Sequence, residues 1–467
     1  MTTVLDYTFK MSKFESSITT NFKKNNGVYY TDLFLSQKMV DDLNIDKDSI
    51  ILDPCCGAGS FIYSAKNKGL NNVYGIDNDE FAVSFCVNNI PNVICIEFDS
   101  LGNNGKTTLN KLSINDKVDF IIGNPPYSPI DKNTILKTND NVFNKIVAGS
   151  GNNLFVAALI RALEMIKPEG IISYIIPKNF LHVNSYSKLR KELLKLKTIV
   201  SIVDIGAYFK DVRGEQIILN IKNCIPINNN IVIKKLVENQ FVTQTQVSQN
   251  YFSNEIILFK SDEDVSIYNK LNSMYQKLTD VCLGYIGRGK SINQDAIIGK
   301  EIRKFGFKNT ISNLDGNQIF IQNIYSTESG IIAAFAGKMK ASQTVTILTD
   351  GNKKMCKFIL GVLHSRLCNF YLYHYCYNYS RLTMHTDAKY LKKIPLPDME
   401  SPHFGEIVIL VEKIEIDEYM SKSWFDNVEI LNELIYKIYK FEKIESQYVD
   451  NEMKLVQSNK WQNNGIF

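Results

Sequence analysis

The stretch 50-IILDPCCGAGSF-61 has the pattern of a strand that passes through a glycine turn into a helix. Three apolar residues lead into Asp53. Gly57 and Gly59 follow at a spacing that allows a sharp turn and a close approach of the backbone to a ligand. The pattern is not the GxGxxG of dinucleotide-binding turns, and a leading carboxylate would repel a phosphate. Asp53 at the end of a strand therefore suits a ligand that carries positive charge.

Two more acidic residues follow the next two apolar runs. The run NVYGID ends in Asp77, and the run NVICIEFD ends in Asp99. A carboxylate after the second strand can accept from ribose hydroxyls, and one after the third can accept from an adenine amino group. Each aspartate alone also fits a turn or a helix cap. Together they predict a pocket for a cationic nucleoside, and S-adenosylmethionine combines adenosine with an ammonium and a sulfonium.

Short apolar runs alternate with helical patterns through the first half of the chain, which predicts an α/β domain with a largely parallel sheet. The runs IVSIVDIG, EQIILNIKN and NIVIKKL have little helix between them and predict an antiparallel edge of that sheet. The polar segment NQFVTQTQVSQN, from about residue 241, predicts a linker. We therefore expect domains at residues 1–240, 241–400 and 401–467, of which the last is helical and acidic.

The stretch 120-FIIGNPPYSP-129 ends a fourth apolar run in two prolines. Each proline removes an amide donor and fixes φ, so the strand should stop at about Gly123 and leave Asn124 and Tyr127 in a rigid turn. The Asn124 side-chain oxygen and the Pro125 carbonyl can accept both hydrogens of an exocyclic amine. Tyr127 adds an aromatic ring to the same rigid turn.

In this order, DPCCGAGSF and NPPY resemble the amino-methyltransferases of DNA. GVYYTD (residues 27–32) resembles the motif that opens their γ class, which includes the TaqI-type adenine methyltransferases of restriction-modification systems. IIPKNFL, LGVLHSRLCNFYL, YLKKIPLP and NELIYKIY are also similar to family segments, so the likeness covers residues 20–445. The resemblance implies a Rossmann-like S-adenosylmethionine-dependent domain with a mixed seven-stranded sheet. An α+β target-recognition region that ends in helices would follow it.

The resemblance also implies roles for individual residues. Phe180 is similar to a second stacking aromatic and Phe155 to a residue of the cofactor pocket, although both also fit a core. Ser100 departs from the apolar residue that the family often has there, so Leu101 or another residue would pack on the cofactor adenine. The catalytic residues so implied are Asn124, Pro125, Tyr127 and Phe180. The cofactor-binding residues are Tyr30, Thr31, Asp53, Cys55, Gly57, Gly59, Asp77, Asn78, Asp99, Ser100, Asn124 and Phe155. The family uses neither a metal nor a separate general base.

The net charge of +4 hides an uneven distribution. Residues 281–400 hold 16 Lys or Arg against 8 Asp or Glu, whereas residues 401–467 hold 7 against 12. A basic block interleaved with aromatics suits a surface that contacts phosphates and probes bases. A solvated face over a tyrosine-rich core has the same composition. With the motifs above, we expect double-stranded DNA as the partner, with Arg288 and Lys290 as DNA-binding candidates.

The cysteines, the histidines and the hydropathy of the chain bear on its redox environment, on membrane insertion and on metal binding. The nine cysteines include no CxxC pair, which favours reduced thiols in the cytoplasm. No run of about 18 apolar residues occurs, and the first residues lack an apolar leader, so we expect neither membrane insertion nor export. The five histidines form no ligand cluster, and no metal is expected.

Other functions fit parts of the same pattern. N4-methylation of cytosine uses the same amine chemistry, although Asn rather than Ser before the two prolines favours adenine. Related tetrapeptides occur in protein-glutamine and RNA methyltransferases. A methylase fused to a nuclease and a catalytically silent DNA-binding subunit are further alternatives. A separately encoded restriction endonuclease is compatible with the main interpretation.

Overall fold

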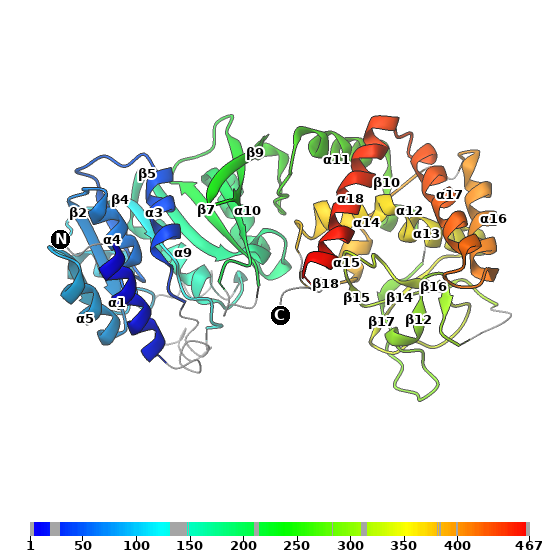
Figure 1. The fold of residues 1–467 in the computed structure, drawn as a ribbon, viewed down its shortest axis with the longest axis horizontal. Coiled ribbons are helices and arrows are strands. Elements are labelled where there is room, and N and C mark those ends of the chain that lie inside the picture. The colour runs from blue at the N-terminus through cyan, green and yellow to red at the C-terminus, as the bar shows by residue number, and fades with distance from the viewer. Residues whose placement is uncertain are drawn as a thin grey trace. The chain divides into compact units, whose positions relative to one another are not determined.

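The computed structural model describes residues 4–18, 29–130, 147, 149–209, 214–282, 284–309, 315–380, 382, 384–397 and 400–463. The chain forms two compact units, residues 1–256 and 257–467, whose elements are labelled in Figure 1. The first unit extends past the expected boundary at residue 240. The reason is that the polar segment expected to be a linker is a strand, β9 (Gln240–Ser248), which pairs along its whole length with β8 (Asn230–Val237).

A nine-stranded sheet forms the centre of the first unit, in the order β3-β2-β1-β4-β5-β7-β6-β8-β9. Its other strands are β1 (Ile50–Asp53), β2 (Asn72–Asp77), β3 (Ile94–Glu97), β4 (Val118–Gly123), β5 (Ile166–Pro177), β6 (Thr198–Gly206) and β7 (Gln216–Lys222). The strands from β3 to β5 are parallel, and β7 runs antiparallel to both of its neighbours. The α/β class is confirmed. Of the three strands expected to form an antiparallel edge, β6 and β7 pair antiparallel, whereas β6 and β8 pair in parallel. The sheet has nine strands rather than seven because the β8–β9 hairpin extends it.

Helices cover this sheet. They are α1 (Val4–Ser17), α3 (Leu33–Asp42), α4 (Ser60–Asn67), α5 (Glu80–Asn89), α6 (Gly105–Lys111), α9 (Leu154–Met165) and α10 (Ser187–Leu196). Side chains of α1, α3, α4 and α5 form one apolar cluster with alternate residues of β1, β2 and β4 to β7. Helices α9 and α10 pack against β5 and β6 outside this cluster. Nine of the twelve residues of α9 are buried, as expected of a helix that is apolar all round.

The strand order fixes where a ligand can bind. The chain runs from β1 through β2 to β3 on one side of β1 and then returns to β4 on the other side. The connections that leave β1 and β4 therefore diverge at their carboxyl ends. In open α/β sheets such a switch point is the usual ligand site. The motifs DPCCGAG and NPPY lie at these two strand ends.

The second unit is α+β, as expected. Its elements are α11 (Asp262–Met274), β10 (Gln276–Lys277), α12 (Leu278–Val281), β11 (Ile286–Arg288), β12 (Ile302–Arg303), β13 (Gly306–Phe307), β14 (Gln318–Gln322), β15 (Ile324–Tyr325), β16 (Ala333–Phe335), β17 (Val345–Thr349), α13 (Lys353–His364), α14 (Arg366–Tyr371), the π-helix η5 (Leu372–Cys376), β18 (Met384–His385), α15 (Ala388–Leu391), β19 (Pro395–Leu396), α16 (His403–Ile416), α17 (Lys422–Ile438) and α18 (Lys443–Asn463). Strands β11, β17, β14 and β16 form its largest sheet. Within this unit, Figure 1 shows the long helices gathered on one side and this sheet on the other.

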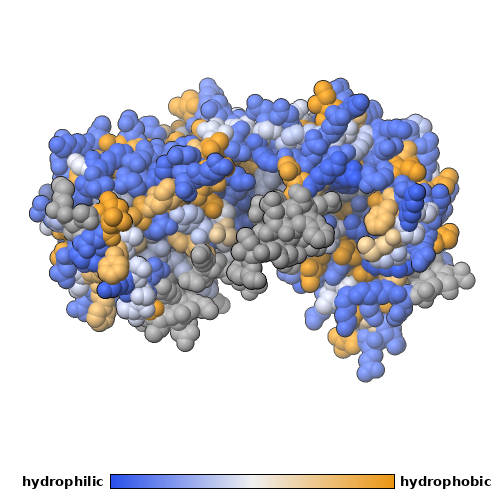
Figure 2. Space-filling model, in the orientation of Figure 1, coloured by the Kyte–Doolittle hydropathy of each residue, from blue (hydrophilic) through white to orange (hydrophobic). Residues whose placement is uncertain are grey.

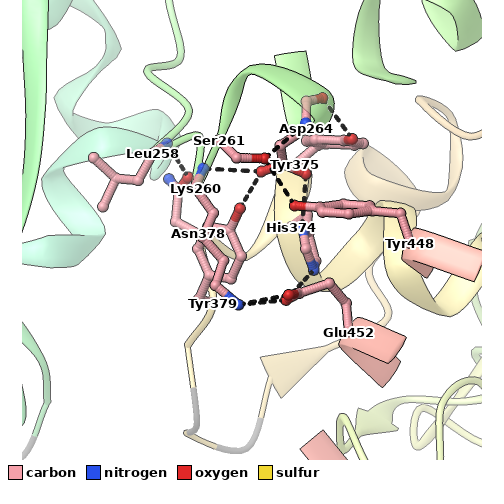
Figure 3. Close-up of polar contacts among 10 residues, drawn as sticks. All are labelled: Leu258, Lys260, Ser261, Asp264, His374, Tyr375, Asn378, Tyr379, Tyr448 and Glu452. Carbon is pink, nitrogen blue, oxygen red and sulfur yellow. Dashed lines mark hydrogen bonds and ion pairs between the residues drawn. The ribbon is translucent and has the colours of Figure 1, made fainter. Parts of the chain in front are cut away.

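A buried polar network joins the last helix to the rest of the second unit (Figure 3). The His374 Nδ1 atom, in the π-helix, lies 2.8 Å from Asp264 Oδ1, and the Tyr379 hydroxyl donates to the other oxygen of Asp264. Glu452 of α18 accepts from Lys260 Nζ and lies 3.8 Å from His374 Nε2. These contacts tie α18 to α11 and the π-helix. Residues 401–467, expected as a separate segment, are therefore part of the second unit.

The visible surface is largely hydrophilic. Figure 2 shows apolar residues on this face singly or in small groups among polar ones. Within the described ranges, no helix combines the length and the apolar composition that a membrane crossing requires.

Candidate active site

The turn after β1 depends on its two glycines. Gly57 and Gly59 have φ values of 51° and 87°, and Gly59 caps the amino end of α4. A Cβ atom on Gly57 would lie 2.8 Å from the Tyr30 ring, and one on Gly59 would lie 2.7 Å from Cys86 Sγ. Both the backbone conformation and the close neighbours exclude a side chain here. The turn can therefore bring backbone amides close to a ligand.

Asp77 holds this turn against the end of β2. Its Oδ2 atom accepts from the Gly57 amide at 2.7 Å, and its Oδ1 atom accepts from the Asp79 amide at 3.0 Å. Burial raises the pKa of Asp77 to about 6, while the two amides favour the ionised form and lower it. Each carboxylate oxygen retains a free lone pair for a ligand hydroxyl.

Asp53, at the end of β1, is less well satisfied. Its side chain is 2% exposed, and its Oδ1 atom accepts from the Cys55 amide at 3.2 Å. Its Oδ2 atom is buried and has no hydrogen-bond partner among the described residues, and the same holds for Thr31 Oγ1. Burial raises the pKa of Asp53 well above its usual range. A buried carboxyl without a partner favours a cation beside it.

The wall of the site beside β3 is formed by residues 99–102. Asp99 Oδ1 accepts from the amides of Leu101 and Gly102, at 3.2 and 2.8 Å. The Ser100 hydroxyl donates to the Pro54 carbonyl at 2.6 Å and so links this wall to the turn after β1. Leu101, named above as a substitute for the missing apolar residue, faces the same space.

These groups surround a cavity of about 1080 Å³ at the carboxyl ends of β1 to β4. The residues that were predicted to bind a cofactor and that line it are Tyr30, Thr31, Asp53, Cys55, Gly57, Asp77, Asn78, Asp99, Ser100 and Asn124. Gly59 and Phe155, the two other predicted residues, do not line it. The Phe155 side chain is fully buried, and its ring packs edge-on against Phe180 and Tyr186, with centroids 6.1 and 5.1 Å away. Phe180 is 1% exposed, so in this structure it presents no face to a base.

The turn after β4 is closed by its own side chains. Asn124 Nδ2 donates to the Tyr29 carbonyl at 3.0 Å, and Asn124 Oδ1 accepts from the Tyr127 hydroxyl at 2.6 Å. The same hydroxyl lies 3.2 Å from the Ile175 carbonyl of β5. The Tyr127 carbonyl accepts from Asn153 Nδ2 at 2.7 Å. As predicted, β4 ends at Gly123, and the turn holds Asn124 beside the cavity.

Sequence reasoning missed several contributors to the site. Phe14 and Ser17 of α1 line the cavity, and α1 packs on the sheet through Tyr7 and Met11. The helical spacing of Tyr7, Met11, Phe14 and Ile18 was a signal for this helix. The Tyr29 carbonyl, which orients Asn124, had no signal in the sequence. Residues 27–28 of GVYYTD lie outside the described residues, as do residues 131–146 and 148.

The two DNA-binding candidates lie in the second unit. Arg288 belongs to β11, and its side chain is 56% exposed. Its Nη2 atom lies 2.8 Å from Asp387 Oδ1. Lys290, two residues later, is also exposed. Arg288 is thus held in one direction by a partner but remains accessible.

Comparison with known proteins identifies relatives of the chain. It is 26% identical over 216 residues to the type II methyltransferase M.VspI of Vibrio sp. (strain 343), which covers 45% of this chain and 52% of that protein. It is also 26% identical to the modification methylase CviBIII of Paramecium bursaria Chlorella virus NC1A, over 41% of this chain and 48% of that protein. The chain thus spans about half the length of these curated relatives.

Solved structures support the fold. The type IIL restriction-modification enzyme MmeI, solved in complex with DNA, matches 97% of this chain and 82% of its own, with a TM-score of 0.57 and 12% identity. A model of the family described as N-6 DNA Methylase matches residues 7–273, which is more than half of the chain. The resemblance to amino-methyltransferases is thereby confirmed, while the γ class stays a prediction. The chain belongs to the N-6 DNA Methylase family.

Proposed function

We propose that the protein is a site-specific DNA methyltransferase that transfers a methyl group from S-adenosylmethionine to the N6 amino group of an adenine extruded from duplex DNA. The observation that carries this proposal is the position of Asn124, which lines the same cavity as Asp53 and Asp77. An acceptor for an amine and acids suited to a cationic nucleoside therefore meet at one site. Such an enzyme acts on DNA in the cytoplasm, and a separately encoded restriction endonuclease is a partner compatible with it.

The unpartnered groups of the cavity fit S-adenosylmethionine. Asp53 Oδ2 needs a cation, and Thr31 Oγ1 has a hydrogen to donate; within the described ranges neither has a partner. The amino-acid end of the cofactor carries an ammonium for the first and a carboxylate for the second. Asp77 would accept from the ribose hydroxyls, and Asp99 would accept from the adenine amino group. The cofactor, when bound, supplies an electrophilic methyl group.

The turn after β4 supplies the chemistry of the acceptor base. The exocyclic amine of adenine is a weak nucleophile because its lone pair is delocalised into the ring. Asn124 Oδ1 and the Pro125 carbonyl would accept its two hydrogens and localise that pair on nitrogen. Because Pro125 and Pro126 make the turn rigid, these acceptors are preorganised. The Tyr127 ring would stack on the extruded base.

The test is direct. Genomic DNA from cells that express the full chain, with Asn124→Ala as the matched control, should be sequenced for modified bases. We expect N6-methyladenine at one short motif with the wild-type protein and a much smaller methylated fraction of that motif with Asn124→Ala. N4-methylcytosine at a defined motif would show that the target base is cytosine rather than adenine, while methyl transfer to an exocyclic amine would stand. Unmodified DNA from cells with folded wild-type protein would overturn the proposal.

The second unit is the proposed reader of the DNA sequence. A base pocket identifies only the extruded base, and the neighbouring pairs must be read in the grooves. We expect Arg288→Ala combined with Lys290→Ala to lower DNA affinity. The slope of log affinity against log salt should fall by about one unit for each phosphate group that the variant no longer neutralises. Lys443→Ala, at an exposed lysine of the acidic tail, is the control. An unchanged slope would exclude these two residues from the interface.

A further inference from the structure

The Tyr127 hydroxyl is hydrogen-bonded to Asn124 Oδ1, the acceptor that the proposed reaction needs. It donates to Asn124 Oδ1 at 2.6 Å, and its longer contact, 3.2 Å, is with the Ile175 carbonyl. A phenol has one hydrogen, so the shorter contact is the main bond. Asn124 Oδ1 is also the acceptor assigned above to the amine of the extruded base. The protein without DNA thus fills that acceptor with a donor of its own.

The Tyr29 carbonyl fixes the orientation of the Asn124 amide. A carbonyl can only accept, so the Asn124 atom 3.0 Å from the Tyr29 carbonyl is the nitrogen. The oxygen therefore points toward Tyr127 and β5, and a flipped amide would place two acceptors together. Burial raises the pKa of the Tyr127 hydroxyl well above its usual range, so the group stays a neutral donor. The Asn124 side chain is held at both ends before any base arrives.

The backbone of the turn is anchored by contacts that do not involve the Tyr127 ring. The Tyr127 backbone is anchored because Asn153 Nδ2, at the amino end of α9, donates to its carbonyl at 2.7 Å. Ser128 is anchored as well, since its carbonyl accepts from the Leu154 amide at 2.9 Å. Asn124 lines the cofactor cavity, whereas Tyr127 is not part of its wall. A rotation of the Tyr127 side chain would therefore release Asn124 and leave the cavity intact.

We propose that the Tyr127 hydroxyl is a placeholder for the target amine: it holds Asn124 in the DNA-free protein and must leave Asn124 Oδ1 before an extruded base can bind. This proposal rests on the proposed function. It separates two roles of one residue. The ring stabilises the base-bound state, while the hydroxyl stabilises the state without a base. Removal of the hydroxyl alone should then favour the base-bound state.

The expected effect follows from the strength of a neutral hydrogen bond. Tyr127→Phe keeps the ring but loses the bond that the wild-type protein must break, which corresponds to about a two- to tenfold tighter complex with the extruded base. If the hydroxyl were only structural, its loss would leave Asn124 less ordered and weaken the same complex. The direction of the change therefore decides between the two roles.

The experiment uses the full chain and a duplex that carries 2-aminopurine at the target adenine of the motif found by sequencing. The fluorescence of 2-aminopurine rises when the base leaves the stack, so a titration without cofactor reports extrusion independently of methyl transfer. We expect a two- to tenfold lower dissociation constant for Tyr127→Phe. The control is Tyr186→Phe, the same change on a ring that packs against Phe155 and Phe180, and it should behave as wild type.

A double-mutant cycle makes the assignment specific. In an Asn124→Ala background the hydroxyl has lost its partner, so Tyr127→Phe should no longer tighten binding. Equal or weaker binding of Tyr127→Phe in the wild-type background would overturn the placeholder while leaving the proposed function intact. An equal gain in both backgrounds would also overturn it, because the bond to Asn124 would then be irrelevant. No fluorescence change with any variant would overturn both the placeholder and the proposed function.

Discussion

Two polar side chains at the ends of the neighbouring strands β1 and β4 differ in how far their hydrogen-bonding groups have partners within the protein. Asp53, at the end of β1, is buried, and its Oδ2 atom has no partner among the described residues. Asn124 follows β4, and both ends of its amide are hydrogen-bonded within the protein. The end of β1 thus leaves a carboxyl oxygen without a hydrogen-bond partner, whereas the amide after β4 already has partners for both its oxygen and its nitrogen.

The difference follows from charge. A buried carboxylate is stabilised only by a cation or by several donors, and the turn after β1 gives Oδ2 neither. A neutral amide is satisfied by ordinary donors and acceptors, and the chain provides both. The two ligands should therefore bind in different ways. The cofactor supplies a missing partner, whereas the base must displace one that is already present.

The largest effect is expected at Asn124. Asn124→Ala removes a preorganised acceptor, so the methyl-transfer rate should fall by about 10²- to 10³-fold. Cofactor affinity should change little, because Asp53 and Asp77 remain. Single-turnover rates and calorimetry measure the two quantities separately.

The matched control is Asn153→Ala, which removes an amide that contacts the Tyr127 carbonyl and caps α9. It should cost stability, about 1 kcal/mol for a lost helix cap, and only a small part of the rate. Equal rate losses in the two variants would contradict the role given to Asn124.

The two strand ends also differ in how far the sequence predicted them. The acids at the ends of β1, β2 and β3 were predictable because each follows a local apolar run, and parallel strands bring their carboxyl ends together. The rigid turn at Asn124 was predictable from two prolines. The bond between Asn124 and Tyr127 was not, because it depends on side-chain directions after the turn. The contact of Tyr127 with the Ile175 carbonyl depends further on how β4 and β5 align.

Other misses have the same origin. The segment that forms β9 is polar because one side of it faces solvent, and only its pairing with β8 makes it a strand. Phe155 and Phe180 each fitted a pocket or a core, and their mutual packing, which no local pattern encodes, puts both in the core. These predictions failed because the structure of each segment depends on contacts with distant parts of the chain. The predictions that were right depended on local sequence patterns.

The second prediction concerns Asp77 in the cavity proposed to bind the cofactor. Asp77→Ala should weaken binding of S-adenosylmethionine by about 1.5–3 kcal/mol, the range for hydrogen bonds to a charged group. Calorimetry on the folded variant measures it. Asp46→Ala, at an exposed aspartate that precedes β1, is the control and should bind normally. Unchanged affinity of Asp77→Ala would remove Asp77 from the site.

The third prediction tests the unsatisfied acid directly through pH. The folded pKa values of Asp53 and Asp77 are raised by burial above their unfolded values near 4, Asp77 to about 6. Their stabilising contribution is therefore complete below pH 4 and is lost as pH rises through the folded pKa values. Without cofactor, this contribution of the two acids to thermal stability should fall from pH 4 toward neutral pH.

A variant isolates the part of this fall that belongs to Asp53. Asp53→Asn keeps the shape but cannot ionise, so the cofactor-free variant should be the more stable protein at neutral pH. Its advantage over wild type should vanish near pH 4, and it should bind the cofactor more weakly. Thermal unfolding at several pH values, with and without cofactor, measures both. A variant less stable than wild type at pH 7 would show that Asp53 already has a partner in the free protein.

The smallest effects should come from two hydroxyls in the same cavity wall, one satisfied and one not. Thr31 Oγ1 is buried without a partner among the described residues, whereas the Ser100 hydroxyl donates to the Pro54 carbonyl. Thr31→Val should therefore lower cofactor affinity by about 0.5–1.5 kcal/mol and leave stability nearly unchanged. Ser100→Ala should do the reverse, because it breaks a bond within the protein and takes nothing from the ligand. Calorimetry and thermal unfolding of both variants give four numbers. If Ser100→Ala reduced cofactor affinity and Thr31→Val did not, the lack of a hydrogen-bond partner in the free protein would not predict which groups bind the cofactor. The difference between Asp53 and Asn124 would then say nothing about how the two ligands bind.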